Sequence, residues 1–334
     1  MKKPIIILLV IMIFLIPSAA FAESKNTMSN EIDLYEYPVT TDMGEWKLLD
    51  NHIDMIEVCT IPEELVKLMS TEELVLNTLN YPLIGDMFAW NSDKEGYYAV
   101  REYCVTLREL EDREDIESAI NYVEDSLTEY FERESLRYDV ARVVLNIIET
   151  ELGLIESNPD YVLLDNRAVV YRTEVTNNNV KTPNGTKIKH YEDLTYNCKD
   201  GDTGETLVPT QATVQTKQSQ LVSQYPLATV ERGICPTYNC HSYAWHSTSS
   251  TNPYWINNPK KYWTDGSYVV VNSAASGRRL VYFNGSTVLH SAKYTSSGSN
   301  VRSKWGYCGL FTHAISYCPY YSASTVRKIY KRAS

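Results

Sequence analysis

The sequence predicts an α+β fold with an acidic helical N-terminal domain, a small β-ribbon, and a basic C-terminal domain of helix and strand. Two observations predict this arrangement. Apolar residues recur at helical spacing within residues 60–158, whereas short β-prone runs and turn signals dominate from residue 159 onwards. Residues 231–334 hold two acids against twelve Lys and Arg, and residues 23–230 hold forty acids against seventeen bases. The net charge of −11 therefore conceals a basic domain joined to an acidic one.

The first residues have the signature of an export signal. Two lysines precede the apolar run Ile5–Ile16, and Ala20-Phe21-Ala22 fits a cleavage site. We therefore expect residues 1–22 to be removed after Ala22, leaving a secreted or cell-wall-associated protein that begins at Glu23. No later run approaches the roughly 20 apolar residues that a membrane span needs, so no transmembrane anchor is expected. An uncleaved N-terminal anchor is the alternative.

The N-terminal part reads as a polar segment followed by a helical domain. Residues 23–59 are poorly patterned, and we expect them to be partly disordered. In residues 60–158, Ser70 and Glu73 have the spacing of a capping box at a helix start. Further amphipathic segments carry apolar faces, formed by Tyr97, Val100, Cys104, Leu107 and Leu110, by residues 116–127, and by Leu136, Val140, Val143, Val144, Ile147 and Ile148. The acids recur on outward faces, and no chemistry is visible in this domain.

The middle of the chain is predicted to be a β-ribbon and a linker. Within residues 159–204, Pro183-Asn184-Gly185 is a hairpin signal, and Tyr161–Leu164 and Ala168–Tyr171 are β-prone. Residues 205–230 are rich in Thr, Gln and Ser and poor in large apolar groups, so they are predicted to link the ribbon to the C-terminal domain.

The C-terminal domain, residues 231–334, contains a candidate nucleophile. Cys240 opens a run in which Tyr243 and Ala244 fall at helical spacing, so we predict it to be the first residue of a short buried helix. The helix dipole and the free backbone N–H groups at such a position lower the pKa of a thiol and can hold an oxyanion beside it. A nucleophilic cysteine needs both of these.

A later strand is predicted to supply the base. Val288–Tyr294 is read as a strand carrying His290, with Val301–Trp305 as its hairpin partner across a turn at Ser296-Ser297-Gly298. In that register position 305 faces His290, and Ser303 lies one pair away on the same face, close enough to orient the imidazole.

Two other residues, His313 and Asp265, are the alternatives to Ser303. The domain has only Glu231 and Asp265 as acids, which disfavours paired-carboxylate catalysis and calcium binding and leaves thiol chemistry.

Three segments carry a resemblance to a known family, namely Asn239-Cys240-His241-Ser242, Leu289-His290-Ser291-Ala292 and Ser303-Lys304-Trp305-Gly306. They resemble the motifs of the NlpC-like cell-wall cysteine peptidases and amidases, the compact papain-like branch, over about residues 231–334. The chain departs from the commoner pattern in having His241 beside the cysteine and no evident His or Asn at the third position. The resemblance implies a helix packed on an antiparallel sheet, and cleavage of an amide bond in cell-wall peptide through a thioester on Cys240, without a cofactor.

Other interpretations of the same residues stay open. Six of the seven cysteines could pair and leave Cys240 free, but Cys240 could also form a disulfide. The candidate zinc ligands, whose spacing matches no familiar site, are Cys235, Cys240, His241 and His246, so no metal is expected. We expect His241 to be held against backbone or solvent, since it points about 100° away from Cys240. His290 could likewise be a satisfied core histidine.

The candidate substrate-binding residues are aromatic, namely Tyr238, Trp245, Trp255, Trp263 and Trp305. They could line a cleft, although most such rings are expected to form the core of the domain. The sequence thus favours an exported cysteine amidase or peptidase. The alternatives are a non-catalytic module that binds an anionic cell-wall polymer on the same fold, and a thiol acyltransferase. Nucleic acid is not an expected partner of an exported protein, and the acidic and basic domains could dock on each other.

Overall fold

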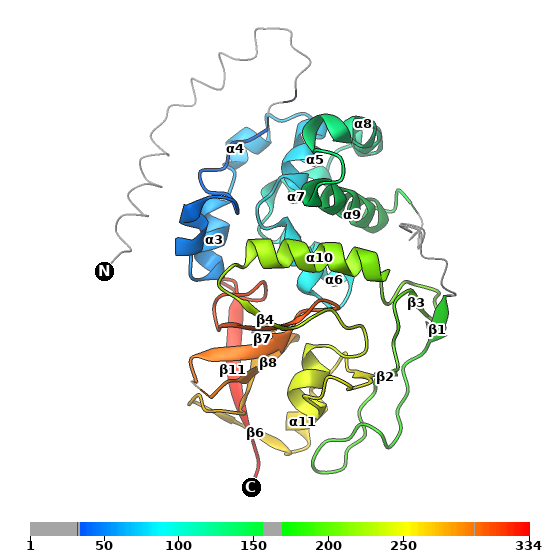
Figure 1. Ribbon diagram of the computed structural model, residues 1–334, viewed down its shortest axis with the longest axis vertical. Helices are drawn as coiled ribbons and strands as arrows, with labels where there is room; N and C mark the ends of the chain where they lie inside the picture. Colours follow the sequence, from blue (N-terminus) through cyan, green and yellow to red (C-terminus); the bar gives the residue numbers. More distant parts are fainter. Residues whose placement is uncertain (1–31, 33, 156–168, 297) are drawn as a thin grey trace.

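The computed structural model describes residues 32, 34–155, 169–296 and 298–334. Short helices form one end of the molecule, and a seven-stranded antiparallel sheet forms the other, so the α+β class is confirmed (Figure 1). The expected signal peptide, the β-prone run Tyr161–Leu164 and Ser297 of the predicted turn lie outside the described residues. None of the helices in the described part of the chain is long and apolar enough to cross a membrane.

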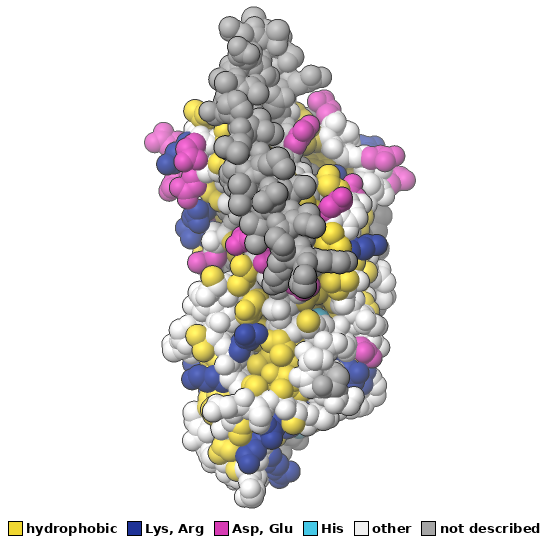
Figure 2. Space-filling model, turned by 90° about the vertical axis from the view of Figure 1, so that its left-hand side faces the viewer, with side chains coloured by type: hydrophobic (Ala, Val, Ile, Leu, Met, Phe, Trp, Pro, Cys, Tyr) yellow, Lys and Arg dark blue, Asp and Glu magenta, His cyan; other side chains and the backbone are white. Residues whose placement is uncertain are grey.

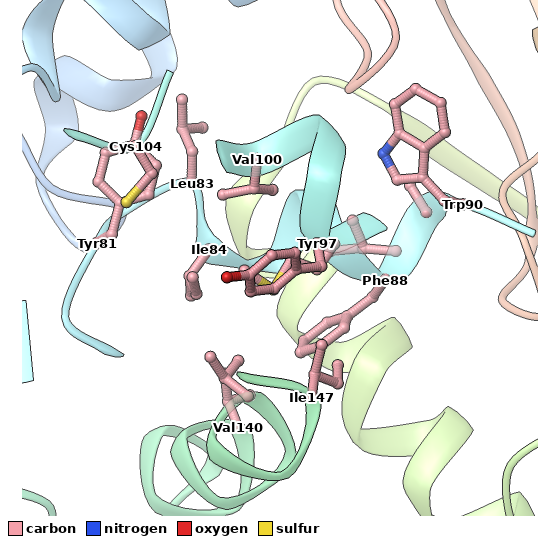
Figure 3. Packing of buried hydrophobic residues seen from close by; sticks show 14 of the residues in the cluster. Tyr81, Leu83, Ile84, Phe88, Trp90, Tyr97, Val100, Cys104, Val140 and Ile147 are labelled. Atoms are coloured by element: carbon pink, nitrogen blue, oxygen red, sulfur yellow. The ribbon is translucent and has the colours of Figure 1, made fainter. Parts of the chain in front are cut away.

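The helical half buries the apolar faces that the sequence indicates. Its elements are η2 (Gly44–Leu48), α3 (His52–Val58), α4 (Glu63–Val66), α5 (Thr71–Leu79), η3 (Ile84–Ala89), α6 (Asp93–Arg101), α7 (Val105–Leu110), α8 (Ile116–Tyr130) and α9 (Leu136–Glu151). The capping box is present, with Ser70 and Glu73 exchanging hydrogen bonds at the start of α5. Figure 3 shows Phe88 of η3 packed beside Ile147 of α9 in the centre of this half.

Two segments predicted to lack regular structure belong to this half. Residues 34–59, within the segment expected to be partly disordered, contain η2 and α3, and the indole N–H of buried Trp46 donates to the carbonyl of Gln224 (2.8 Å). Residues 205–230, expected to be a linker, contain α10 (Gln211–Gln224), which lies between the helices and the sheet (Figure 1). The buried face of α10 consists of two aliphatic residues with a lysine and a glutamine, so its composition resembles that of a linker.

The β-ribbon contains the hairpin turn that the sequence predicts. The backbone N–H of Ile188 donates to the carbonyl of Val180 (3.0 Å), and Gly185 adopts φ +89°, which closes the hairpin at Pro183-Asn184-Gly185 as expected. The short strands of this region are β1 (Val170–Arg172), β2 (Tyr191–Glu192) and β3 (Cys198–Asp200). Strand β1 pairs with β3, and β2 pairs with β5 (Tyr254–Trp255), which ties the ribbon to the C-terminal half.

The large sheet has the strand order β4-β10-β9-β8-β7-β11-β6. Its strands are β4 (Thr229–Arg232), β6 (Tyr268–Val271), β7 (Arg279–Asn284), β8 (Thr287–Tyr294), β9 (Asn300–Lys304), β10 (Leu310–Ala314) and β11 (Thr325–Arg332). The hairpin β8–β9 has the predicted register, because Lys293 lies opposite Arg302 and Tyr294 opposite Val301. The short helix η4 (Ser242–His246) packs on β8 and β9, and α11 (Lys261–Thr264) packs near β6.

One hydrophobic core joins the acidic and basic halves. It contains Trp90 of the helical half together with Trp305 and Phe311 of the sheet half. The backbones of the two halves also approach closely at Gly306, where φ is +47° and a Cβ atom would collide with the carbonyl oxygen of Trp90. Figure 2 shows most Asp and Glu side chains over the helical end and mainly Lys and Arg over the sheet end. Position 231 is therefore a boundary of charge and not of packing.

Candidate active site

Asn239 builds the helix start that presents Cys240. Its side-chain oxygen accepts from the backbone N–H of Ser242 (3.0 Å), and its carbonyl accepts from the backbone N–H of Tyr243 (2.9 Å). Its amide group donates to the carbonyl of Ile256 (2.7 Å), which anchors the cap. Cys240 is therefore the first residue of the helical turn, as predicted, and the turn continues as the π-helix η4.

Cys240 is only 2% exposed, and the backbone N–H groups of Ser291 and His241 lie near its Sγ. Burial raises the pKa of Cys240 to about 12, with Glu95 adding to the increase. The two N–H groups and the nearby Lys304 ammonium lower the pKa, but by less. The helix-start effect expected from the sequence is thus present, and burial outweighs it.

His290 is a buried imidazole that forms no hydrogen bond within the described part of the chain. Neither Nδ1 nor Nε2 has a partner, and the ring is fully buried. The ring of Tyr320 stacks on it, with centroids 3.6 Å apart and an interplanar angle of 7°. Burial holds the pKa of His290 well below its ordinary value, and His241 and His313 lower it further. Buried polar atoms without hydrogen-bond partners are rare, and each one lowers the stability of the fold. The burial of this imidazole therefore does not serve stability.

Cys240 lies near the part of strand β8 that carries His290. The Sγ atom of Cys240 contacts the backbone of Ser291, the residue that follows His290 on β8. Tyr320 stacks on His290. Burial raises the pKa of Tyr320, and negative charge at nearby Cys240 raises it further. Both groups are neutral at rest, because burial raises one pKa and lowers the other. The thiolate–imidazolium pair that a helix-start cysteine suggests is therefore disfavoured in this closed arrangement.

Ser303 does not orient His290, contrary to the prediction. Its Oγ lies 2.8 Å from Nε2 of His313 and accepts from the indole N–H of Trp305 (3.1 Å). His313 donates from Nδ1 to the carbonyl of Ala314 (2.9 Å), so its Nε2 is the acceptor of the Ser303 hydroxyl. Burial lowers the pKa of His313 to about 4, which keeps the ring neutral. The register was predicted correctly, but the serine finds its partner on β10.

His241 is a structural residue, as expected, although a hydroxyl group and not backbone or solvent holds it. Its Nδ1 lies 2.9 Å from Oγ of Ser291, which also accepts from the indole N–H of Trp245 (3.0 Å). Burial lowers the pKa of His241 to about 3. Ser291 therefore uses its side chain to fix His241 and its backbone to contact Cys240.

The aromatic residues proposed to bind substrate lie mostly in the core. Tyr238, Trp245, Trp255 and Trp305 are at most 3% exposed, and Trp263 is half-buried against the same cluster as Trp245. Trp305 stacks on Phe311 with centroids 4.2 Å apart. Their faces are occupied by other rings, so they present no cleft to a substrate, and the expectation that most form the core is confirmed.

All seven cysteines lie in the described part of the chain and all are free thiols. Cys240 is therefore not in a disulfide, and the structure contains none of the six-cysteine pairings that the sequence allows. Among the described residues, no group of three or more His, Cys, Asp or Glu side chains is arranged to hold a metal ion.

Sequence reasoning missed two residues of the site. Lys304 is fully buried, and its Nζ donates to the carbonyls of Cys235 (2.8 Å) and Gly306 (2.9 Å). Burial lowers its pKa to about 8. Tyr320 lies in the segment between β10 and β11, where no local pattern indicates a contact with His290.

Comparison with known proteins gives no match, whether with family models, curated proteins or solved structures.

Proposed function

We propose that the protein is an exported cysteine hydrolase, an amidase or peptidase that cleaves an amide bond in cell-wall peptide through a thioester on Cys240. One observation carries the proposal. A free thiol at a helix start lies near the backbone next to His290, a buried imidazole whose nitrogens have no hydrogen-bond partner among the described residues. A binding module on the same fold has no need for this pair, so the observation favours an enzyme. The packing of η4 on the strand that carries the histidine supports the proposal, since a papain-like fold would have that arrangement.

The reaction follows from the roles of the two residues. His290 accepts the thiol proton of Cys240 while Sγ attacks the substrate carbonyl carbon. Backbone N–H groups at the helix start, that of His241 among them, stabilise the oxyanion. The protonated His290 then gives its proton to the departing amine, leaving a thioester. A water molecule, deprotonated by His290, attacks the thioester, and the carboxylic acid leaves as the thiol is restored.

The neutral resting pair has a consequence for this mechanism. Since burial keeps the Cys240 thiol and the His290 imidazole uncharged, the proton moves as the carbonyl is attacked, when the developing oxyanion balances the imidazolium. The proposed substrate and location rest on the export signature of residues 1–22 and on the Lys and Arg side chains over the sheet end (Figure 2). Such a surface suits a cell wall containing anionic polymers.

The test compares two serine variants of the mature protein. Cys240→Ser should abolish release of amines from purified cell-wall peptide while circular dichroism stays unchanged. Cys59→Ser, which alters a buried free thiol of the helical half, should keep the activity. Full activity of Cys240→Ser, or loss of its folded structure, contradicts the proposal.

A further inference from the structure

An aromatic ring occupies the place where an orienting hydrogen bond to His290 was expected. The Tyr320 ring lies nearly parallel to the imidazole, with centroids 3.6 Å apart, and neither imidazole nitrogen has a hydrogen-bond partner in the part of the chain that the structure describes. We propose that Tyr320 is the positioning residue of His290, and that stacking on its ring sets the plane in which His290 meets Cys240. This inference rests on the proposed function, because it assigns a role within the same site.

A stacked ring constrains the imidazole differently from a hydrogen-bond acceptor. Rotation of the imidazole about its bond to Cβ would drive its edge into the Tyr320 ring, so the plane is fixed. Tyr282, on the neighbouring strand β7, packs at 5.7 Å with an interplanar angle of 52° and limits movement on another side. A hydrogen-bond acceptor would also select one tautomer, whereas the ring leaves either nitrogen able to take the thiol proton.

The helical half holds Tyr320 in place. The Tyr320 hydroxyl donates to the carbonyl of Ala89 at the end of η3, and its ring packs edge-on against Trp90, with centroids 5.1 Å apart. His52 at the start of α3 ties down the same segment, because its backbone N–H donates to the carbonyl of Ser316 (2.8 Å) and its Nδ1 lies 2.6 Å from the carbonyl oxygen of Tyr321. The helical half, to which the proposed function assigns no catalytic group, thus supports the ring of Tyr320.

The experiment measures alkylation of Cys240 by iodoacetamide between pH 5 and 9, with thermal unfolding measured in parallel. Tyr320→Leu removes the ring and should slow alkylation about tenfold at neutral pH, since misplaced groups lose reactivity steeply. Tyr320→Phe keeps the ring and should stay within about twofold of the wild type. Tyr317→Leu is the matched control, because Tyr317 is equally buried in the same segment and packs on Tyr225 instead. It should lower stability comparably and leave the alkylation profile unchanged.

The outcomes separate this inference from the proposed function. If His290→Ala slows alkylation and Tyr320→Leu does not, Tyr320 has no positioning role and the cysteine–histidine pair stands. If His290→Ala has no effect either, the pair itself is wrong. An equal loss in Tyr317→Leu means general loosening and overturns the role of Tyr320. Should Tyr320→Leu not fold, the ring protons of His290 in the wild-type protein provide the test. Stacking requires upfield ring-current shifts that Tyr320→Phe preserves, and ordinary shifts overturn the proposal.

Discussion

Two buried histidines, two strands apart in the same sheet, have opposite surroundings. His313 on β10 uses both ring nitrogens, one with Ser303 and one with the carbonyl of Ala314. His290 on β8 uses neither among the described residues, although it is as deeply buried. Leaving a buried polar group without a partner costs about 1–3 kcal/mol. The sheet satisfies His313 in its interior, so the unsatisfied His290 is the ring to which the proposed function assigns a reactive role.

The largest expected effect comes from removing the unsatisfied ring. His290→Ala should lower the rate of amide cleavage about 10²–10⁴-fold, as expected for loss of a general base. Its free energy of unfolding should change less than packing loss alone suggests, because two unsatisfied nitrogens disappear with the ring. Kinetics on cell-wall peptide and urea unfolding measure the two effects. A variant that is strongly destabilised yet active would reverse the assignment.

The converse pattern is expected for the satisfied ring. His313→Ala removes the acceptor of the Ser303 hydroxyl proton and one of the two donors to the Ala314 carbonyl, which keeps the backbone N–H of Tyr317, and should destabilise the protein by about 1–3 kcal/mol. Alkylation of Cys240 in the folded variant should proceed nearly as in the wild type. A fall in the alkylation rate of Cys240 that the loss of folded protein does not explain would place His313 in the catalytic machinery.

The same comparison predicts a pH dependence of stability. Burial lowers the pKa of His313 from 6.5 to about 4, so its neutral form is favoured in the folded state. The corresponding stability is present above the unfolded-state pKa and is lost as the pH falls through about 4, in total about 3 kcal/mol. Urea unfolding between pH 7 and 4 should show this decline, and His313→Gln should flatten it. An identical slope in the variant would show that His313 does not contribute.

The smallest effect concerns Lys304. Its ammonium favours the thiolate of Cys240, so Lys304→Met should raise the apparent pKa of alkylation by about half a unit, or slow the reaction about threefold at a fixed pH below 8. Lys293→Met, on the neighbouring strand, is the control and should leave the profile unchanged. A shift of the same size in both variants would indicate a general charge effect.

Local signals allowed part of this structure to be predicted. The helix start at Cys240, the capping box at Ser70 and the register of the β8–β9 hairpin each depend on residues close in sequence. Helix α10 was mistaken for a linker because its buried face is formed partly by Lys217 and Gln224. The contact of Tyr320 with His290 depends on how segments far apart in the chain meet, which no local pattern records.

The hydrogen bond from the Tyr320 hydroxyl to the carbonyl of Ala89 joins residues 231 positions apart in the sequence. The hydrogen bond from the Tyr307 hydroxyl to the carbonyl of Asn91 joins residues 216 positions apart. Contacts of such long range form late, because the chain must lose loop entropy before they stabilise it. The helical half is synthesised first, and it cannot complete its core until the last strands arrive. On the proposed function, a nascent or truncated chain would carry the thiol of Cys240 without the ring that aligns its base, so activity would appear only in the final step of folding.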